Sequence, residues 1–124
     1  MNNTVRTYLI GRARRRTNQA INYQALSDEC HLGINMQHGQ HIRNQMASIL
    51  GDISRYEHEN GRPLLSSLVL RLHDNYEGDG FFKLAESLGF GNWQTLRDNE
   101  LFEVQQIRQC ISFWSNDSNY RDFG

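Results

Sequence analysis

The sequence predicts one α+β domain that is mostly helical, with about five helices and a short strand or hairpin. Three observations support this fold class. The 124 residues have the usual length of a single domain, and 38% of them are hydrophobic, which is enough for one core. Apolar residues recur every three or four positions along most of the chain, as on the buried face of a helix. Residues 64–72 instead have the alternation expected of a strand that is covered on both sides.

The first half of the chain predicts three helices and one extended segment. A helix is expected from Thr4 to Arg16 with Thr4 as its N-cap, and residues 21–23 form a short pairing segment. A second helix runs from Gln24 to Leu32 and ends at Gly33. A long third helix, from about His38 to Glu57, has the clearest pattern. Its buried face carries Ile42, Met46, Ile49, Leu50, Ile53 and Tyr56.

The middle of the chain predicts a wing-like hairpin. Asn60-Gly61-Arg62-Pro63 ends the long helix, because glycine accepts a positive φ and proline cannot extend the helical hydrogen bonds. The strand at residues 64–72 leads into a polar turn at residues 74–80. A return strand at Phe81 and Phe82 is expected to be very short or absent, because residues 81–88 have helical spacing and favour a helix.

The end of the chain predicts one more helix and a frayed tail. Trp93 and Leu96 are expected to anchor the core, and Asp98 is expected to cap the last helix. The inward face of that helix carries Leu101, Val104, Ile107, Ile111 and Trp114. Residues 115–124 are polar and are expected to fray. Because no repeat or linker divides the chain, residues 1–124 are expected to form a single domain.

Charge is distributed unevenly along the chain. Residues 1–27 contain five arginines and no Asp or Glu. All 14 acidic residues therefore lie in the remainder of the chain, and the net charge of the whole is -1. The five are Arg6, Arg12, Arg14, Arg15 and Arg16. Arginine favours bidentate contacts with phosphates, guanine edges or carboxylates. This Arg-rich N-terminal segment therefore predicts either an anionic partner or pairing with the acidic remainder of the chain.

The order helix, strand, helix, long helix, strand and turn resembles the winged helix-turn-helix arrangement, in which the third helix enters the major groove. The outer face of the long helix is polar and nearly acid-free, with Asp52 as the exception. Side chains of Asn, Gln, Ser and Arg can read base edges. The alternative is an ordinary solvated helix face. The residues predicted to contact DNA are Arg12, Arg14, Arg15, Arg16, Gln40, Arg43, Asn44, Ser48 and Arg55.

Two resemblances extend this interpretation. Residues 55–88, with Tyr-Glu-His, Gly-Arg-Pro-Leu-Leu-Ser-Ser-Leu-Val and Gly-Asp-Gly-Phe-Phe, resemble small uncharacterised bacterial proteins and imply no activity. Residues 20–75 are similar in outline to the winged-helix half of alkyltransferase-like DNA-repair proteins, which implies a nucleic-acid-binding surface. The reactive Pro-Cys-His-Arg motif of that family is absent, since the turn reads Gly-Arg-Pro-Leu at residues 61–64. Alkyl transfer is therefore not implied.

Two other functions remain open beside a non-enzymatic DNA-binding module. In the first, the Arg-rich N-terminal segment docks an acidic protein, and Tyr56, Arg62 and Phe81 form an exposed contact patch. The second is a metal-dependent nuclease whose carboxylates converge on a cation. Those carboxylates would be Asp52, Glu57, Glu59, Asp74, Glu77 and Asp79.

No cofactor or metal is expected. The five histidines lack the strong ligand spacings, and Cys30 and His31 point about 100° apart on a helix, so they do not form a catalytic pair. Cys30 and Cys110 are expected to be buried thiols. No apolar run approaches the roughly 20 residues that span a bilayer, and the N-terminus lacks the apolar region of a secretory signal. We therefore expect a cytoplasmic protein with no membrane partner.

Overall fold

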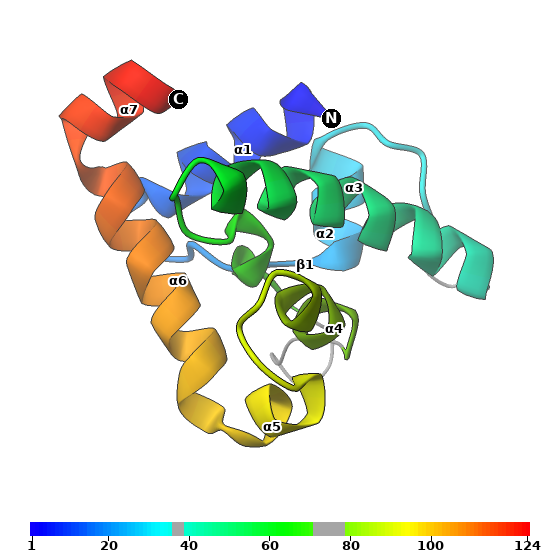
Figure 1. Cartoon of the computed structure of the whole chain (residues 1–124). Coiled ribbons are helices and arrows are strands. Elements are labelled where there is room, and N and C mark those ends of the chain that lie inside the picture. Colours follow the sequence, from blue (N-terminus) through cyan, green and yellow to red (C-terminus); the bar gives the residue numbers. More distant parts are fainter. Residues whose placement is uncertain (36–38, 71–78) are drawn as a thin grey trace.

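A computed structural model describes residues 1–35, 39–70 and 79–124, and its elements surround a short central 3-10 helix (Figure 1). The α-helices of this part of the chain are α1 (Asn3–Ala13), α2 (Tyr23–Glu29), α3 (Gln40–Glu59), α4 (Asp79–Ser87), α5 (Trp93–Asp98), α6 (Glu100–Ser115) and α7 (Asp117–Phe123). The other elements are β1 (Ile21–Asn22), the 3-10 helix η1 (Leu65–Leu68) and β2 (Val69–Leu70). The mostly helical α+β class is confirmed. None of the helices in the described ranges combines the length and apolar character needed to cross a membrane.

Asparagine begins most of the helices. In five of them the N-cap side-chain oxygen accepts a hydrogen bond from a backbone amide of the first turn, which leaves fewer amides without a partner. These caps are Asn2, Asn22, Asn92, Asn99 and Asn116. The prediction of Thr4 and Asp98 as caps was wrong, because a nearby asparagine occupies each position. α3 differs, since it begins after Gly39 without a side-chain cap among the described residues.

The main core lies between α1, α3 and α6, with η1 packed against all three. Met46, Leu50 and Ile53 of α3 are buried as predicted, and Ile42 and Ile49 pack against them half-buried. Tyr56 is the exception, because 41% of it is exposed at the end of the helix. A second cluster joins α4 and α5 to the start of α6. It contains Leu64, Phe81, Phe82, Ala85, Leu96 and Phe102.

Of the strand predicted at residues 64–72, only Val69–Leu70 is a strand among the described residues, because Leu65–Leu68 form a 3-10 helix; residues 71 and 72 lie outside the described ranges. Residues 64–69 are all buried, so the sequence pattern could not separate a strand covered on both faces from a turn enclosed on all sides. The Ser54 hydroxyl donates to Ser66 Oγ at 2.7 Å, which satisfies two hydroxyls inside the core. The pairing segment near Ile21 is confirmed, because Ile21 pairs with Val69 in a parallel two-stranded sheet.

The predicted wing is not confirmed. Residues 71–78 lie outside the described ranges and include most of the predicted turn. Phe81 and Phe82, the residues of the proposed return strand, belong to α4, which agrees with the favoured helix at residues 81–88. The described sheet is parallel, whereas a hairpin requires antiparallel strands.

The inward face predicted for α6 was partly wrong. Leu101 is 62% exposed and Val104 is 38% exposed, although Trp114 is fully buried. The buried face carries Phe102, Gln106, Cys110 and Trp114. This helix has two apolar stripes. The stripe that contains Phe102 is the buried one, because Phe102 packs into the second cluster.

Several predicted boundaries also shift. The first helix ends at Ala13 rather than Arg16. The second ends at Glu29 rather than Leu32, and His31, two residues later, adopts φ 54°. Within residues 115–124, which were predicted to fray, the structure has α7 at Asp117–Phe123. Asn116 caps this helix, and Arg6 and Arg14 contact it.

Candidate functional site

The outer face of α3 is the most exposed polar surface that the sequence singled out. Between Gln40 and Ser48 only Ile42 and Met46 are half-buried or buried. Figure 1 shows the beginning of α3 extending beyond the neighbouring helices. The first acidic residue of the helix is Asp52, so three turns of it carry no negative charge. This part of α3 can approach a large, flat or grooved partner without a steric obstacle from the described helices.

The predicted residues of α3 do share this face. The side-chain amide of Gln40 donates to Asn44 Oδ1 at 3.0 Å, and Arg43 and Ser48 are exposed beside them. Arg55 lies two turns further along, where its Nη1 is 3.3 Å from Asp52 Oδ1. Both partners of that ion pair are about half exposed, so it contributes little energy and can exchange for another anion.

A groove of about 510 Å³ runs between α3 and α4. Its polar lining includes Asn44, Ser48 and Arg55 from α3, with Lys83 and Ser87 from α4. None of the described residues that line the groove is Asp or Glu, so its two charged side chains are both cationic. Lys83 was not predicted as a site residue, although it is the only lysine in the chain. It lies on α4, directly after the buried Phe81 and Phe82.

Arg12, which was predicted to contact DNA, binds its own chain. Its Nε donates to the carbonyl of Gln19 at 3.0 Å, and its Nη2 donates to the carbonyls of Asn18 and, at 2.8 Å, Ala20. The guanidinium thereby closes the turn between α1 and β1. Three carbonyl partners fix its position and leave it little freedom to follow a phosphate.

Arg14 is also engaged internally. Its Nη1 donates to the carbonyl of Trp114 at 2.8 Å and its Nη2 to Asp117 Oδ1 at 2.9 Å. The guanidinium also stacks on the ring of Tyr120, 4.2 Å from its centroid. Arg14 therefore joins α1 to α6 and α7, as in the alternative that paired the arginines with the acidic remainder of the chain.

Arg15 and Arg16 differ from these two, because both are exposed beyond the end of α1. They are not part of the face of α3. The nine residues predicted to contact DNA therefore divide into a group on α3, an engaged pair on α1 and an exposed pair after α1.

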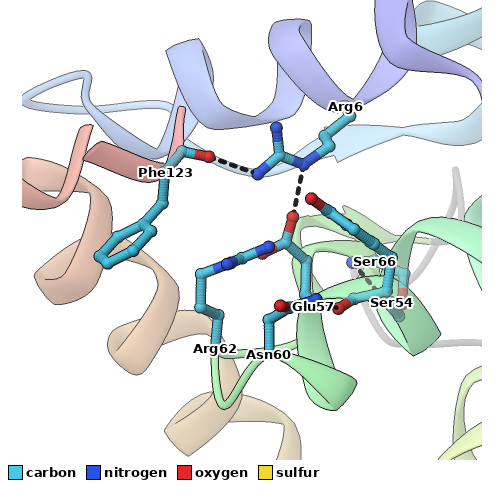
Figure 2. A network of polar contacts seen from close by, with 8 residues as sticks. Arg6, Ser54, Glu57, Asn60, Arg62, Ser66 and Phe123 are labelled. Atoms are coloured by element: carbon cyan, nitrogen blue, oxygen red, sulfur yellow. Dashed lines mark hydrogen bonds and ion pairs between the residues drawn. The ribbon is translucent and has the colours of Figure 1, made fainter. Parts of the chain in front are cut away.

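A buried ion cluster joins the two ends of the chain to α3 (Figure 2). Glu57 has no exposed surface, and its Oε1 lies 2.5 Å from Arg6 Nε while Arg62 Nε binds its Oε2. Arg6 also donates through Nη2 to the carbonyl of Phe123 at 2.7 Å. The ring of Tyr56 lies 5.3 Å from the guanidinium carbon of Arg6 and 5.2 Å from that of Arg62.

This cluster was not predicted, although a signal for it existed. Glu57 continues the spacing of Met46, Leu50 and Ile53, which places its carboxylate on the buried face of the helix. A carboxylate in that position requires buried positive partners. Which arginines would supply them could not be read from the sequence.

The exposed contact patch predicted from Tyr56, Arg62 and Phe81 does not exist. Arg62 is 9% exposed and Phe81 is 5% exposed. Phe81 packs edge-on against Phe82 at 5.4 Å, within the second core cluster rather than beside Tyr56. Arg62 is buried against Glu57, and Phe81 is buried in the core, so only Tyr56 of the three is exposed.

The acidic residues of the predicted nuclease that the structure describes do not come together. Glu57 is held by two arginines, and Asp79 lies 3.7 Å from Arg97. Asp74 and Glu77 fall outside the described ranges. Within those ranges no group of three or more His, Cys, Asp or Glu side chains is placed to hold a metal ion.

Both cysteines are buried free thiols. Burial raises the pKa of the Cys30 thiol, and the nearby carboxylate of Glu29 raises it further. A thiol with a raised pKa is a poor nucleophile at neutral pH. Cys110 donates its thiol to the carbonyl of Leu64 at 3.1 Å, which gives it a structural contact.

The fold and the site thus define a small, mostly helical α+β domain with one exposed face of amide, hydroxyl and arginine side chains. Comparisons with protein-family models, curated proteins and solved structures give no match. The function must therefore be argued from the residues themselves.

Proposed function

We propose that this protein is a cytoplasmic, non-enzymatic module that binds nucleic acid, with duplex DNA as the expected form, through the outer face of α3. The observation that carries the proposal is that this face is polar with Asp52 as its one acidic exception, and that no described residue lining the adjoining groove is acidic. Exposed helices usually carry Glu and Lys, which favour helix formation. Here Gln, Asn, Ser and Arg occupy these positions, and they are side chains suited to base edges and phosphates.

In the proposed complex α3 acts as the recognition helix of a winged-helix-type module. The order of elements supports this role, because a helix, a short strand and a second helix precede α3 and a strand follows it. Gln40, Asn44 and Ser48 face the base edges. The first amides of α3 have no described side-chain cap and can donate to a phosphate.

Three cations would contact the phosphates in this arrangement: Arg43, Arg55 and Lys83. Because the whole chain has a net charge of -1, we expect modest affinity that depends on local contacts rather than on overall attraction. The exposed Arg15 and Arg16 extend the interface only if the duplex reaches the end of α1. Arg12 and Arg14 are excluded from the proposal because their guanidinium groups bind the protein's own chain.

The test is fluorescence anisotropy of a labelled duplex titrated with protein at several salt concentrations. Each phosphate contact releases condensed counterion, so Arg43→Ala, Arg55→Ala and Lys83→Ala should each reduce the slope of log K against log salt by about 1. Arg121→Ala is the matched control, because it removes the same charge from an exposed site on α7. It should leave the slope unchanged.

Two outcomes would contradict the proposal. One is the absence of binding to duplex DNA or RNA at about 50 mM salt and 10 μM protein, where non-specific binders register. The other is an equal loss of slope in the control variant, which would mean that total charge rather than the face of α3 governs binding. An acidic protein partner would then be the remaining hypothesis.

A further inference from the structure

A second cavity of about 640 Å³ lies at the opposite end of α3, between the turn after that helix and α6 and α7. It shares no lining residue with the groove between α3 and α4. Phe90 and Phe113 supply aromatic surface. The polar lining is formed by His58, Arg62, Gln106, Gln109, Ser112, Asn116 and Asn119. No acidic side chain is among the described residues that line it.

Arg62 lines this cavity, and its guanidinium group also packs against the rings of Tyr56 and Phe123, 5.2 Å and 5.6 Å from their centroids. Its side chain is only 7% exposed, and its Nε binds Glu57. Its Nη2 is buried and has no hydrogen-bond partner among the described residues. Because the single charge of Glu57 is shared with Arg6, the cluster has a net positive charge. A buried donor of this kind is rare in proteins, and it favours an acceptor with negative charge.

Two of the amides that line the cavity, Gln106 and Asn116, are oriented as donors, whereas Asn119 uses its NH₂ group on the carbonyl of Phe113 at 3.0 Å. The side-chain oxygen of Gln106 accepts from the backbone amide of Leu64 at 3.3 Å, and that of Asn116 accepts from the backbone amide of Asn119 at 3.0 Å. In both side chains the backbone takes the acceptor end, so the NH₂ group is the end that remains for a ligand. Gln106 and Asn116 therefore offer donors that suit an oxyanion.

We propose that this cavity binds a small organic oxyanion, a carboxylate or phosphate carried by a flat apolar group. The oxyanion lies beside the positively charged Arg62 and accepts hydrogen bonds from the amides of Gln106 and Asn116, and the apolar group contacts Phe90 and Phe113. The size of the cavity lies within the range of small-molecule sites. His58, whose ring is 5.2 Å from that of Phe90, lies where the polar and aromatic parts of the lining meet.

The experiment uses benzoate, phenyl phosphate and the neutral benzyl alcohol as probes of the full chain. Two-dimensional NMR follows the side-chain NH₂ signals of Gln106 and Asn116 during titration to about 10 mM, which would nearly saturate a site with a Kd of 1 mM. We expect a saturable shift with benzoate, phenyl phosphate or both, and their relative affinities identify the preferred oxyanion. Benzyl alcohol should shift these signals at least tenfold less.

Two variants separate the site from the stability of the buried cluster. Arg62→Lys keeps a positive charge opposite Glu57 but removes the second guanidinium donor, and it should weaken binding about tenfold. His58→Ala leaves both arginine contacts with Glu57 in place and should also weaken binding. It therefore provides the test if Arg62→Lys fails to fold. Arg55→Ala, which alters the separate groove on α3, is the control and should bind as the wild type does.

The proposal is wrong if neither anion gives a saturable shift, or if benzyl alcohol shifts the signals as strongly as benzoate. It is also wrong if the folded variants at the cavity bind with unchanged affinity. These outcomes are independent of DNA binding, because the two sites share no residue and use different probes.

Discussion

The two ends of α3 use polar side chains in opposite ways. At the beginning of the helix the exposed face carries amides, hydroxyls and arginines without a carboxylate, and it projects away from the other helices (Figure 1). At the end of the helix Glu57 is enclosed by Arg6 and Arg62 beneath α7 (Figure 2). The buried end joins Arg6 of α1 and Phe123 of α7 to the core, while the other end carries the exposed polar face.

This difference shows that a high arginine content in the sequence does not by itself predict an anion-binding surface. Arg6, Arg12, Arg14 and Arg62 all bind carbonyls or carboxylates of their own chain. On α3 the arginines are exposed beside neutral polar side chains, and the half-exposed pair of Arg55 with Asp52 can exchange for another anion, so the arginine content there supports an external partner. Four predictions test the contrast, in order of decreasing effect.

The largest effect is expected at the buried end. Glu57→Gln leaves two buried guanidinium groups without a counter-charge, which should lower the free energy of unfolding by about 3 to 5 kcal/mol. Glu59→Gln is the matched control on the same helix, because Glu59 is exposed and its loss should cost less than about 0.5 kcal/mol. Urea denaturation measures both. Equal costs would show that the buried cluster does not stabilise the fold.

Ile53 and Ser48 compare the two faces of α3 directly. Ile53 is fully buried, so Ile53→Ala should cost about 2 to 4 kcal/mol through lost burial and the cavity that remains. Ser48 is exposed, and Ser48→Ala should change stability by less than about 0.5 kcal/mol. If Ile53→Ala cost no more than Ser48→Ala in chemical denaturation, the orientation of the helix would be wrong and the proposed binding face with it.

A pair of glycines tests how α3 ends. Gly61 adopts φ 72°, as its position after the helix predicted, whereas Gly11 lies inside α1. A Cβ at either position would meet nothing within 4 Å, so only backbone conformation separates them. Gly61→Ala should destabilise by about 1 to 2 kcal/mol, and Gly11→Ala should stabilise by about 0.5 to 1 kcal/mol. Thermal unfolding that moved both variants in the same direction would contradict this explanation.

The smallest effect concerns Cys30, whose pKa is raised by burial and by Glu29. The folded state then holds the thiol proton more tightly than the unfolded state does. This contribution to stability is complete below the ordinary thiol pKa of about 8.5 and is lost as pH rises through the raised value. Denaturation from pH 7 to 10 should show a weaker decline for Cys30→Ala than for the wild type. An identical decline would argue against the raised pKa.

Local sequence signals determined much of the fold. The apolar spacing of residues 42–53 and the Asn-Gly-x-Pro stop gave the long helix and its end within about two residues. The short pairing segment at Ile21 and the helix at residues 81–88 were also predicted correctly. The asparagine caps were visible in the sequence as well, although Thr4 and Asp98 were chosen instead. These features depend on backbone conformation and on neighbours a few residues apart.

Tertiary structure decided the features that depend on distant partners. Leu65–Leu68 form a 3-10 helix because three helices enclose them, and α6 turns Phe102 rather than Leu101 inward because Phe102 packs into the second cluster. α7 is contacted by Arg6 and Arg14, which precede it by more than 100 positions. The sequence by itself determined which residues could bury a surface or bind an anion. Only the packed structure determined which arginines met a carboxylate of their own chain, because that outcome depends on which distant segments the fold brings within hydrogen-bond distance.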